Sequence, residues 1–362
     1  MTVIPMKSNR YQPQRSYDWN YLNAPEWTAE QNEQLLRVSE NLACLPAHSK
    51  YAGIDVRRPI SVAAGPLLNG HWCLAYAALG FEVVTYKTVR TVERDCFPRP
   101  NLLPVMNKAL HDLGQIVPER PQMEGSWAVS FGMPSRTPDD WQRDIAWTRS
   151  QLPSTHKLAV SVVGTVEAGS TLRELADDYA RCAQWAASAG ADLIEMNFSC
   201  PNVCSDDGQL FQFPDRAAVV AESVADRLER LGYSGPLLAK IGYLKDDETL
   251  FQLADGLRGV ITGCVMCNSI PAQVVDTAGN MLFEGQSRGI CGESTRPLSV
   301  DQTRRFSGNE LSRTDGLLTL GVGGIHSAKD VREYLGAGAE SVQVATAAML
   351  NTDLASQLDL VS

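Results

Sequence analysis

The residues best able to do chemistry stand at or just after the ends of short apolar runs. They are two lysines and three asparagines, Lys87, Lys240, Asn197, Asn202 and Asn268. Ammonium and amide groups around the mouth of an apolar pocket can bind a polar, planar, partly anionic ligand. Taken alone, such a lysine is usually a solvated charge, and such an asparagine often belongs to a turn. Their recurrence at one place in successive units favours a shared binding site.

A thiol adds acid–base chemistry to this set. Cys200 lies between Asn197 and Asn202, and an unperturbed cysteine has a pKa of about 8.5. The thiol is therefore mostly protonated at neutral pH, so it acts as an acid as it stands and as a base after a modest decrease of its pKa. An inert loop cysteine is the alternative. If Lys87 lies within a few ångström, its charge supplies part of that decrease.

Two turns near the carboxyl end carry a separate signal. Residues 321–325 read Gly-Val-Gly-Gly-Ile, and the apolar run 341–345 ends beside Thr346. Glycine-rich turns expose backbone N–H groups, and the helix that follows adds the positive end of its dipole. In a barrel of alternating strands and helices, the loops after the seventh and eighth strands are the usual phosphate site. These turns therefore predict a ligand that bears a phosphate.

The elements that must position these residues alternate along the chain from about residue 59. The short runs rich in Val, Ile, Leu and Ala are residues 60–64, 82–88, 127–131, 158–164, 193–198, 237–241, 260–268, 317–321 and 341–345. They lack strict alternation, which is typical of parallel strands buried on both faces. Amphipathic segments lie between them, at residues 171–189, 217–231, 247–257 and 328–335. About eight such units predict an α/β fold of the (β/α)8 TIM-barrel type, with an open doubly wound sheet as the alternative.

The barrel prediction also indicates where a site belongs. Active-site groups of this architecture lie at the carboxyl ends of the strands, where the lysines, the asparagines and the glycine turns all fall. Residues 57–362 are expected to form the barrel, with an insertion around residues 92–125. Residues 1–56 hold several Tyr and Trp, and we expect them to pack on the barrel as an N-terminal extension rather than form a separate domain.

Composition narrows the class of protein further. The 362 residues carry 32 Lys and Arg against 42 Asp and Glu, a net charge of −10, so a nucleic-acid partner is not expected. No apolar run approaches the roughly 18 residues of a membrane helix, and the first residues lack the apolar core of a secretory signal. Nine cysteines are too sparse for a disulfide scaffold. We therefore expect a cytoplasmic protein with reduced thiols, no metal site and no membrane contact.

At these motifs the sequence resembles the dihydroorotate dehydrogenase family, whose members are FMN-dependent (β/α)8 barrels. The most specific segment is Asn197-Phe-Ser-Cys-Pro-Asn202, close to the family's Asn-Leu-Ser-Cys-Pro-Asn. Supporting segments are residues 86–91, Lys240, Asn268-Ser269, and residues 289–292, 321–325 and 338–346. The resemblance runs in order from about residue 59 to residue 349.

The resemblance implies roles for individual residues. Cys200 would be the catalytic base, as in the soluble class 1 enzymes. Lys87 would be the second catalytic residue and would lie between flavin and substrate, in contact with the flavin. Lys240 would lie near the polar pyrimidine edge of the flavin, where a positive charge favours the anionic reduced form. The other residues implied to bind FMN are Ala64, Gly65, Thr88, Asn197, Gly292 and, around its phosphate, Gly323, Gly324, Ala345 and Thr346. Those implied to bind substrate are Phe131, Gly132, Met133, Asn197, Asn202, Asn268 and Ser269.

Departures from the family pattern lie in the substrate half. After the third expected strand the family has Asn-Ser-Met-Gly or a relative, whereas this chain has Val129-Ser-Phe-Gly132. An asparagine that would pair with the pyrimidine is thereby replaced by Val129, unless the alignment slips by one and Ser130 takes its place. Loss of such a partner costs about 1–3 kcal/mol. The stretch between Lys87 and this loop, and residues 1–56, are also longer than the family needs.

These features predict an FMN-dependent oxidoreductase that interconverts a C–C single and double bond next to a carbonyl in a small cyclic amide or a related compound. Its substrate is expected to be less polar than dihydroorotate on one edge, near Val129, Phe131 and Met133. A genuine dihydroorotate dehydrogenase of pyrimidine biosynthesis is the closest alternative. A non-catalytic flavin- or phosphate-binding relative and a sugar-phosphate isomerase are more distant ones. We expect a homodimer, and a separate electron-transfer partner stays open.

Overall fold

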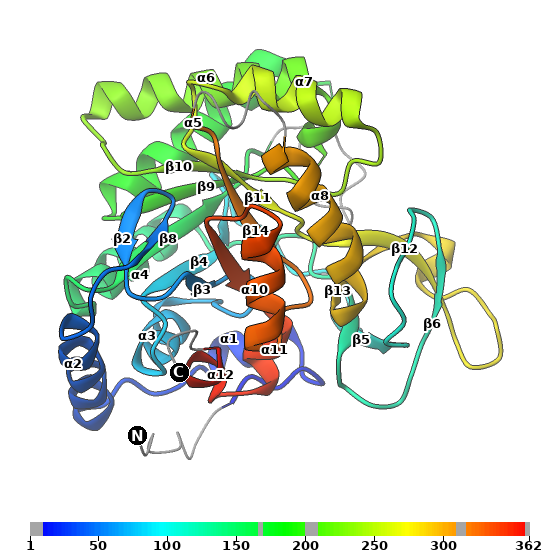
Figure 1. Ribbon diagram of the computed structural model, residues 1–362, viewed down its shortest axis with the longest axis horizontal. Helices are drawn as coiled ribbons and strands as arrows, with labels where there is room; N and C mark the ends of the chain where they lie inside the picture. Colours follow the sequence, from blue (N-terminus) through cyan, green and yellow to red (C-terminus); the bar gives the residue numbers. More distant parts are fainter. Residues whose placement is uncertain (1–9, 166–168, 200–208, 309–315, 359–362) are drawn as a thin grey trace.

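The computed structural model describes residues 10–165, 169–199, 209–308 and 316–358. Eight parallel strands close into a barrel in the order in which they follow one another along the chain (Figure 1). They are β3 (Ile60–Val62), β4 (Val83–Val89), β8 (Lys157–Val162), β9 (Leu193–Asn197), β10 (Leu237–Lys240), β11 (Gly263–Met266), β14 (Leu318–Val322) and β15 (Ser341–Val344). The ring closes where β15 pairs with β3, with Val342 opposite Ile60. The predicted (β/α)8 barrel is thereby confirmed.

Helices between the strands cover the outside of the barrel. They are α3 (Gly70–Ala78), α4 (Pro138–Gln151), α5 (Leu172–Ser188), α6 (Pro214–Leu231), α7 (Asp247–Leu257), α8 (Arg296–Gly308), α10 (Ala328–Gly336) and α11 (Thr346–Leu350). Capping boxes start α5, with Thr171 and Glu174, and α10, with Ser327 and Asp330. Each box satisfies N–H groups that the first helical turn leaves without a partner. None of the described helices is both long and apolar enough to cross a membrane.

A hairpin closes the amino-terminal end of the barrel. Its strands are β1 (Ser49–Tyr51) and β2 (Ile54–Val56). Tyr51 is fully buried and packs in one cluster with interior residues of several barrel strands, among them Val83 and Leu193. Because this end is filled, the carboxyl ends of the strands are left as the end at which side chains can line a cavity.

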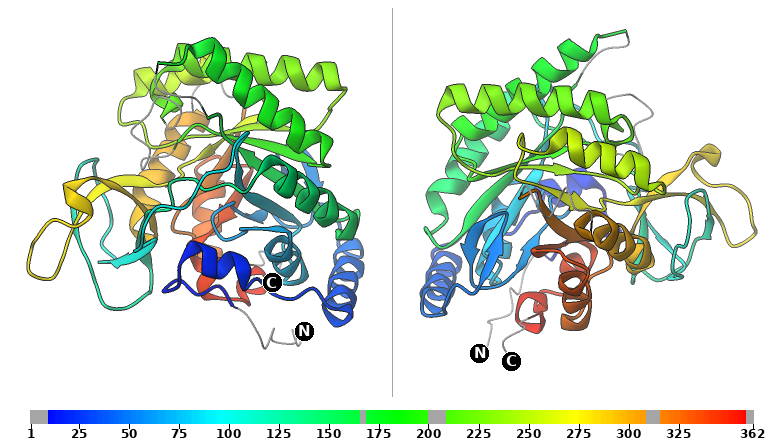
Figure 2. Two further views of the ribbon diagram at one scale, coloured as in Figure 1. Left: turned by 180° about the vertical axis from the view of Figure 1, so that it is seen from behind. Right: turned by 45° about the horizontal axis from the view of Figure 1, so that its top comes forward.

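Beside the barrel stands a five-stranded sheet, which we call the accessory sheet (Figure 2). In spatial order its strands are β5 (Leu102–Val105), β7 (Ser126–Val129), β13 (Arg288–Gly292), β12 (Ile270–Val275) and β6 (Ile116–Pro118). The prediction of a barrel strand at residues 127–131 is therefore wrong, because β7 pairs antiparallel with β5 and β13 instead. The cause is burial: Trp127 and Ala128 are fully buried within the accessory sheet, so the run has the apolar character of a barrel strand. The third barrel strand is β8.

Two helices precede the hairpin, α1 (Tyr17–Leu22) and α2 (Ala29–Ala43). α2 packs against α3 on the outside of the barrel. α1 lies against the loop that follows β7, where the rings of Tyr17 and Phe131 meet edge to face with centroids 5.8 Å apart. The Tyr17 N–H donates to Asn101 Oδ1 over 3.1 Å. The aromatic residues near the start of the chain thus reach the side of the barrel mouth.

Candidate active site

Two adjoining cavities open at the carboxyl ends of the barrel strands, with volumes of about 140 and 130 Å³. The first, lined by Gly323 and Gly324, is called the glycine-loop cavity here, and the second, lined by Lys87 and Lys240, the central cavity. The residues that line both cavities are Asn268, Cys291, Val322, Ala345 and Thr346. Because they share this wall, the two cavities form one elongated site.

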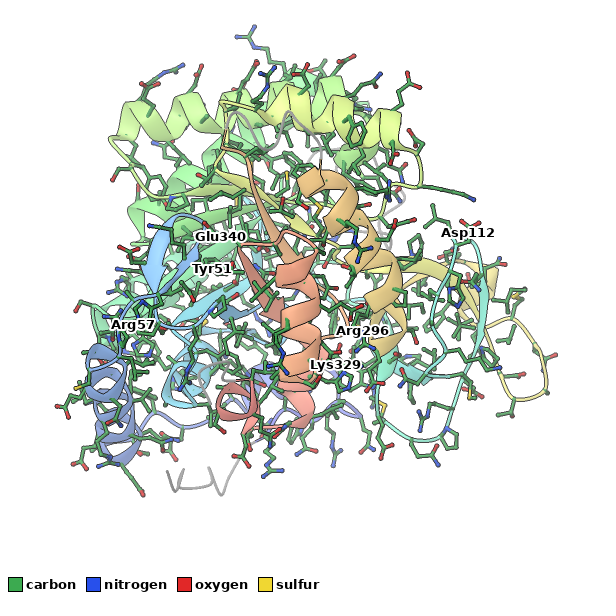
Figure 3. The ribbon with its side chains drawn as sticks, viewed as in Figure 1. Tyr51, Arg57, Asp112, Arg296, Lys329 and Glu340 are labelled. Atoms are coloured by element: carbon green, nitrogen blue, oxygen red, sulfur yellow. The ribbon has the colours of Figure 1, made fainter. Side chains whose placement is uncertain are left out.

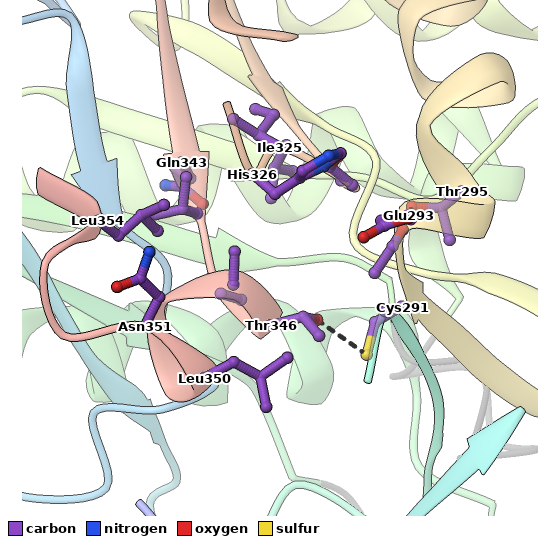
Figure 4. Close-up of a pocket in the computed structure, with 18 of the residues that line it drawn as sticks. Cys291, Glu293, Thr295, Ile325, His326, Gln343, Thr346, Leu350, Asn351 and Leu354 are labelled. Atoms are coloured by element: carbon purple, nitrogen blue, oxygen red, sulfur yellow. Dashed lines mark hydrogen bonds between the residues drawn. The ribbon is translucent and has the colours of Figure 1, made fainter. Parts of the chain in front are cut away.

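Backbone conformation shapes the glycine-loop cavity, whose lining is drawn in Figure 4. Gly323 and Gly324 have φ angles of 126° and 67°, in the region that favours glycine. A Cβ on Gly324 would stand 2.7 Å from Arg296 Cβ and 3.0 Å from the carbonyl oxygen of Gly292. Sterics therefore exclude other residues at this position, and the backbone itself forms the cavity wall.

The glycine loop is anchored from behind. The Tyr334 hydroxyl of α10 donates to the Gly323 carbonyl over 2.7 Å, and its ring leaves no room for a side chain at Gly321. Among the described residues, no lysine or arginine lines this cavity. An anion would therefore be held by backbone N–H groups and hydroxyl groups, close to the start of α10 with its positive dipole end.

A threonine and a cysteine face each other where the two cavities meet. Thr346 Oγ1 donates to Cys291 Sγ over 3.4 Å, as the dashed line in Figure 4 marks. Burial is the main cause that raises the pKa of the Cys291 thiol to about 11. This thiol therefore stays protonated at neutral pH, and it serves the site as a small apolar wall.

Polar groups of the central cavity come from neighbouring strands. Thr88 and Ser161 hydroxyls lie 2.9 Å apart, and Asn197 Nδ2 donates to Thr88 Oγ1 over 3.5 Å. Asn268 Nδ2 donates to the carbonyl oxygen of Ser199 over 2.6 Å, which ties the end of β11 to the end of β9. These contacts hold the amide groups in place before any ligand arrives, which lowers the entropy cost of binding.

A buried ion pair also lines the central cavity. Lys240 Nζ is 3.5 Å from Glu195 Oε1, and their side chains expose 5% and 0% of their surface. Gln343 bridges the pair, because its Oε1 accepts from Lys240 Nζ and its Nε2 donates to Glu195 Oε2, both over 2.7 Å. The same Nε2 donates to Tyr51 Oη over 2.8 Å. The network thus links the cavity to the hairpin at the opposite end of the barrel.

The outer wall of the central cavity is apolar and comes from the accessory sheet. Leu102, Trp127 and Val129 line it, followed by Phe131 and Met133 of the next loop. Neighbouring strands β5 and β7 place these side chains on one face, since alternate residues of a strand point the same way. This wall offers a ligand shape and apolar contact rather than hydrogen bonds.

The loop after β7 is held tightly in an unusual conformation. Gly132 and Met133 both have positive φ angles, 74° and 53°. The fully buried Arg90 donates from Nε to the Met133 carbonyl over 3.0 Å. Lys87 Nζ lies 5.7 Å from the centroid of the Phe131 ring, within reach of a cation–π contact. The Phe131 ring is thereby in contact with both Lys87 and Tyr17.

Val129, and not Ser130, faces the central cavity. The Ser130 hydroxyl accepts from Arg288 Nε over 3.1 Å, and the Ser130 N–H donates to the Asn101 carbonyl over 2.8 Å. Ser130 is therefore engaged within the accessory sheet. The alternative alignment, in which Ser130 would replace the family's asparagine, does not put a hydroxyl into the cavity.

The structure brings the predicted site residues together. All those it describes line one or both cavities: Ala64, Gly65, Lys87, Thr88, Phe131, Gly132, Met133, Asn197, Lys240, Asn268, Ser269, Gly292, Gly323, Gly324, Ala345 and Thr346. Cys200 and Asn202 lie outside the described residues. The function of each residue stays a prediction. Within the described part of the chain, no group of three or more His, Cys, Asp and Glu side chains could hold a metal ion.

Several polar residues of the site were not predicted from the sequence. Glu293, Thr295, His326 and Asn351 line the glycine-loop cavity. Three more belong to barrel strands, Ser161, Glu195 and Gln343. Each stands inside an apolar strand, and each is fully buried. A charged or amide side chain in such a run is the signal that could have revealed them, because buried polar groups require partners. The partners themselves lie on other strands, and only the folded barrel shows them.

The carboxyl-end cavities and the closed barrel together define a (β/α)8-barrel enzyme. Comparison with known proteins makes this specific. The family model for dihydroorotate dehydrogenase matches residues 47–358. The chain belongs to the dihydroorotate dehydrogenase family, and it is an oxidoreductase that acts on CH–CH bonds. The resemblance seen at the motifs is confirmed.

Individual relatives support the assignment. A dihydroorotate dehydrogenase of Dictyostelium discoideum is 30% identical over 318 residues, covering 83% of this chain and 84% of the relative. A putative dihydroorotate dehydrogenase A (fumarate) of Aeropyrum pernix is 27% identical, with 82% and 84% covered. The catalytic subunit of a dihydroorotate dehydrogenase B (NAD(+)) of Thermoplasma volcanium is 23% identical, with 82% and 85% covered.

The fold also has a solved counterpart. The crystal structure of the dihydroorotate dehydrogenase of Eimeria tenella in complex with ferulenol superposes with a TM-score of 0.68. It covers 92% of this chain and 90% of its own, at 15% sequence identity. At that identity the likeness concerns the fold alone.

Proposed function

We propose that the chain binds FMN along the two cavities and uses it to interconvert a C–C single and double bond next to a carbonyl in a small cyclic amide. The observation that carries this proposal is a single elongated site with a glycine loop at one end and lysine and asparagine side chains at the other. The first end suits a phosphate, and the second suits a polar, planar ring.

The residues present fit this cofactor. A Cβ on Gly65 would stand 3.8 Å from both Ala345 Cβ and Met349 Cε, and all three residues line the central cavity. These would be ordinary van der Waals contacts, so the fit rests on the glycine loop, where a Cβ on Gly324 would stand 2.7 Å from Arg296 Cβ and only backbone can form the wall. In this proposal Gly323, Gly324, Ala345 and Thr346 hold the phosphate, assisted by Gly292. Ala64, Gly65, Lys87, Thr88, Asn197 and Lys240 surround the ring system.

When bound, FMN would supply the two-electron acceptor for the hydride that leaves the substrate. Oxidation of a CH–CH group also releases one proton from the adjacent carbon, and we assign that proton to the thiolate of Cys200. The side chains of Asn197, Asn202, Asn268 and Ser269 would hold the substrate ring by hydrogen bonds. Lys87 would keep a positive charge beside it, and Phe131, Gly132 and Met133 would close over its apolar edge.

Two substrates compete within this proposal. The names of the relatives favour dihydroorotate itself. Val129 favours a ring that is less polar on the edge facing the accessory sheet, because its side chain can neither donate nor accept a hydrogen bond. We propose the second, with genuine dihydroorotate oxidation as the alternative.

The test is anaerobic reduction of the FMN-loaded protein by a panel of cyclic amides, with dihydroorotate as the first compound. The loss of flavin absorbance measures the reduction. Reduction by any member supports the proposed reaction. Turnover of dihydroorotate with kcat/KM above about 10⁴ M⁻¹s⁻¹ would identify the alternative, a pyrimidine-pathway enzyme. A protein that neither purifies with FMN nor takes it up from solution contradicts the proposal as a whole.

The partner and the location of the protein belong to the same proposal. The relatives' names point to fumarate in one case and NAD(+) in another, the latter for a catalytic subunit. A separate electron-transfer chain is accordingly one candidate acceptor, and stopped-flow reoxidation with fumarate, oxygen and a quinone distinguishes the others. We also propose a cytoplasmic homodimer, which sedimentation of the purified protein and cell fractionation test.

A further inference from the structure

The buried network around Lys240 has a consequence for the charge of the site. Lys240 and Glu195 form an ion pair whose side chains expose 5% and 0% of their surface. An ammonium and a carboxylate together carry no net charge. Lys240 is the residue that resemblance places at the polar edge of the flavin, and its charge is balanced by the carboxylate of Glu195, two residues before Asn197.

Hydrogen bonding defines the state of Glu195. A lysine ammonium can only donate, and Gln343 Nε2 also donates. Glu195 receives the first on Oε1 and the second on Oε2. Both of its oxygens therefore accept, which suits an ionised carboxylate; an amide would place a donor against one of these donors, and a protonated carboxyl would carry an O–H for which these two contacts supply no acceptor. The contacts of Glu195 with Lys240 and Gln343 are thus both with donors, the arrangement that a carboxylate needs when it is buried.

The same network fixes the position of Lys240. Gln343 uses its oxygen for Lys240 and its nitrogen for Glu195 and Tyr51. Tyr51 comes from the hairpin at the amino-terminal end of the barrel and is labelled in Figure 3. Burial is the main cause that raises the pKa of the Tyr51 hydroxyl, and the nearby charge of Glu195 is the second. Four side chains thus form one connected unit.

Resting on the FMN binding proposed above, we propose that Glu195 is a positioning residue that sets the reduction potential of the bound flavin through Lys240. Reduction adds negative charge to a flavin, so each positive charge near it favours the reduced state and each negative charge the oxidised state. The carboxylate of Glu195 offsets the ammonium of Lys240 at close range inside the barrel. Glu195 keeps the potential lower than Lys240 alone would make it.

The test is a charge cycle at these two positions. Potentials of FMN-loaded wild type, Glu195→Gln, Lys240→Met and the double variant are measured by equilibration with redox dyes at pH 6 and pH 8. Glu195→Gln should shift the equilibrium with the dye at least about tenfold toward reduced flavin at pH 6, which is about 30 mV for a two-electron couple. Lys240→Met should shift it by a similar factor the other way. The double variant should return to near the wild-type value, since the net charge is restored.

Controls separate charge from disturbance. Tyr51→Phe removes a hydroxyl from the same network without changing its charge, and its potential should stay within about threefold of wild type in the same equilibrium. Glu195→Asp keeps the charge and should restore most of the wild-type potential. The FMN dissociation constant of each variant, titrated on apoprotein, gives a readout independent of turnover. If Glu195→Gln does not fold, the effect of the carboxylate is measured as the difference in potential between Lys240→Met and the double variant. The double variant should fold, because removing both partners of a buried pair is better tolerated than removing one.

The outcomes are distinct from those of the proposed function. FMN-loaded Glu195→Gln with an unchanged potential at both pH values would overturn this inference and leave the proposed function intact. A double variant no closer to wild type than Lys240→Met would do the same. A wild-type protein that binds no FMN would overturn the proposed function, and this inference with it.

Discussion

The two halves of the site are built from different materials. The glycine-loop cavity is built around the backbone of Gly323 and Gly324, whose φ angles only glycine adopts easily, with side chains such as Glu293 and His326 beside it. The outer wall of the central cavity is formed by side chains of the accessory sheet, such as Leu102, Trp127 and Val129. Backbone recognition is fixed by sterics, whereas a side-chain wall changes with every substitution. The first half should therefore tolerate little variation, and the second should be where substrate choice is set.

The largest effect is expected when a side chain is introduced into the glycine loop, which tests whether the backbone of this loop binds the phosphate. Gly324→Asp would bring a Cβ within 2.7 Å of Arg296 Cβ at a φ of 67° and a carboxylate toward the proposed phosphate. We expect the FMN dissociation constant to rise by at least about a hundredfold, because several charge-assisted hydrogen bonds to the phosphate would be lost. Fluorescence titration of apoprotein with FMN measures it.

A matched control lies in the same unit. A Cβ on Gly336, at the end of α10, would meet nothing within 4 Å, so Gly336→Ala should bind FMN as wild type does. A folded Gly324→Asp protein with full FMN occupancy would show that the phosphate binds elsewhere.

The second largest effect concerns proton transfer. Cys200→Ala should keep FMN bound and slow its reduction by substrate by about a hundredfold or more, as loss of a general base does. Cys200→Ser should keep some activity with a higher pH optimum, because a hydroxyl is a poorer base. Single-turnover absorbance measures both rates.

Cys291 is the control for this prediction. Its thiol lines both cavities, but burial raises its pKa to about 11, so Cys291→Ala should slow reduction less than tenfold. An unchanged rate in Cys200→Ala would assign the base to another residue.

The third prediction tests whether the outer wall of the central cavity sets the choice of substrate. Wild-type protein should be reduced by dihydroorotate slowly or not at all, and Val129→Asn should speed that reaction by about five- to tenfold, the contribution of one hydrogen bond. Val129→Leu, which adds volume without polarity, should not. Fast turnover of dihydroorotate by wild type, or no gain from Val129→Asn, would remove Val129 as a determinant of specificity.

The smallest effect is expected from the N-terminal segment. Tyr17→Ala removes the ring that packs on Phe131 at 5.8 Å, so Phe131 should be held less firmly over the substrate. We expect KM to rise about three- to tenfold with kcat less affected, as loss of one aromatic contact implies. Tyr17→Phe keeps the ring and should behave as wild type, and steady-state kinetics compare the two. Equal KM values for wild type and Tyr17→Ala would mean that α1 does not support the site.

Much of the arrangement at the carboxyl ends of the barrel strands could be predicted from the sequence because it is local. Each strand of the barrel ends in the residues that line the cavity, so the order of Lys87, Asn197, Lys240 and Asn268 along the chain already carries their arrangement. The conformation of the glycine loop could be predicted for the same reason, since it depends on the glycines of the loop itself.

The outer wall of the central cavity could not be predicted, because its strands pair with strands that are remote in sequence. Residues 127–131 looked like a barrel strand, and nothing local reveals that Val129 pairs with Leu102 on one side and Gly289 on the other. Glu195 likewise shows an unusual charge in an apolar run, but its partners Lys240 and Gln343 come from other strands. Pairings of this kind are decided by tertiary packing.

The accessory sheet has a further consequence for how the chain becomes an enzyme during synthesis. β5, β6 and β7 are made early, but β13, which lies beside β7, is made about 160 residues later, after β8 through β11. The edge of β7 that pairs with β13 therefore stays unpaired while four strands of the barrel are being synthesised. Contacts so distant in sequence form late and leave apolar edges exposed meanwhile. Substitutions that weaken β12 or β13 should accordingly reduce the yield of soluble protein more than they reduce the stability of molecules that have already folded.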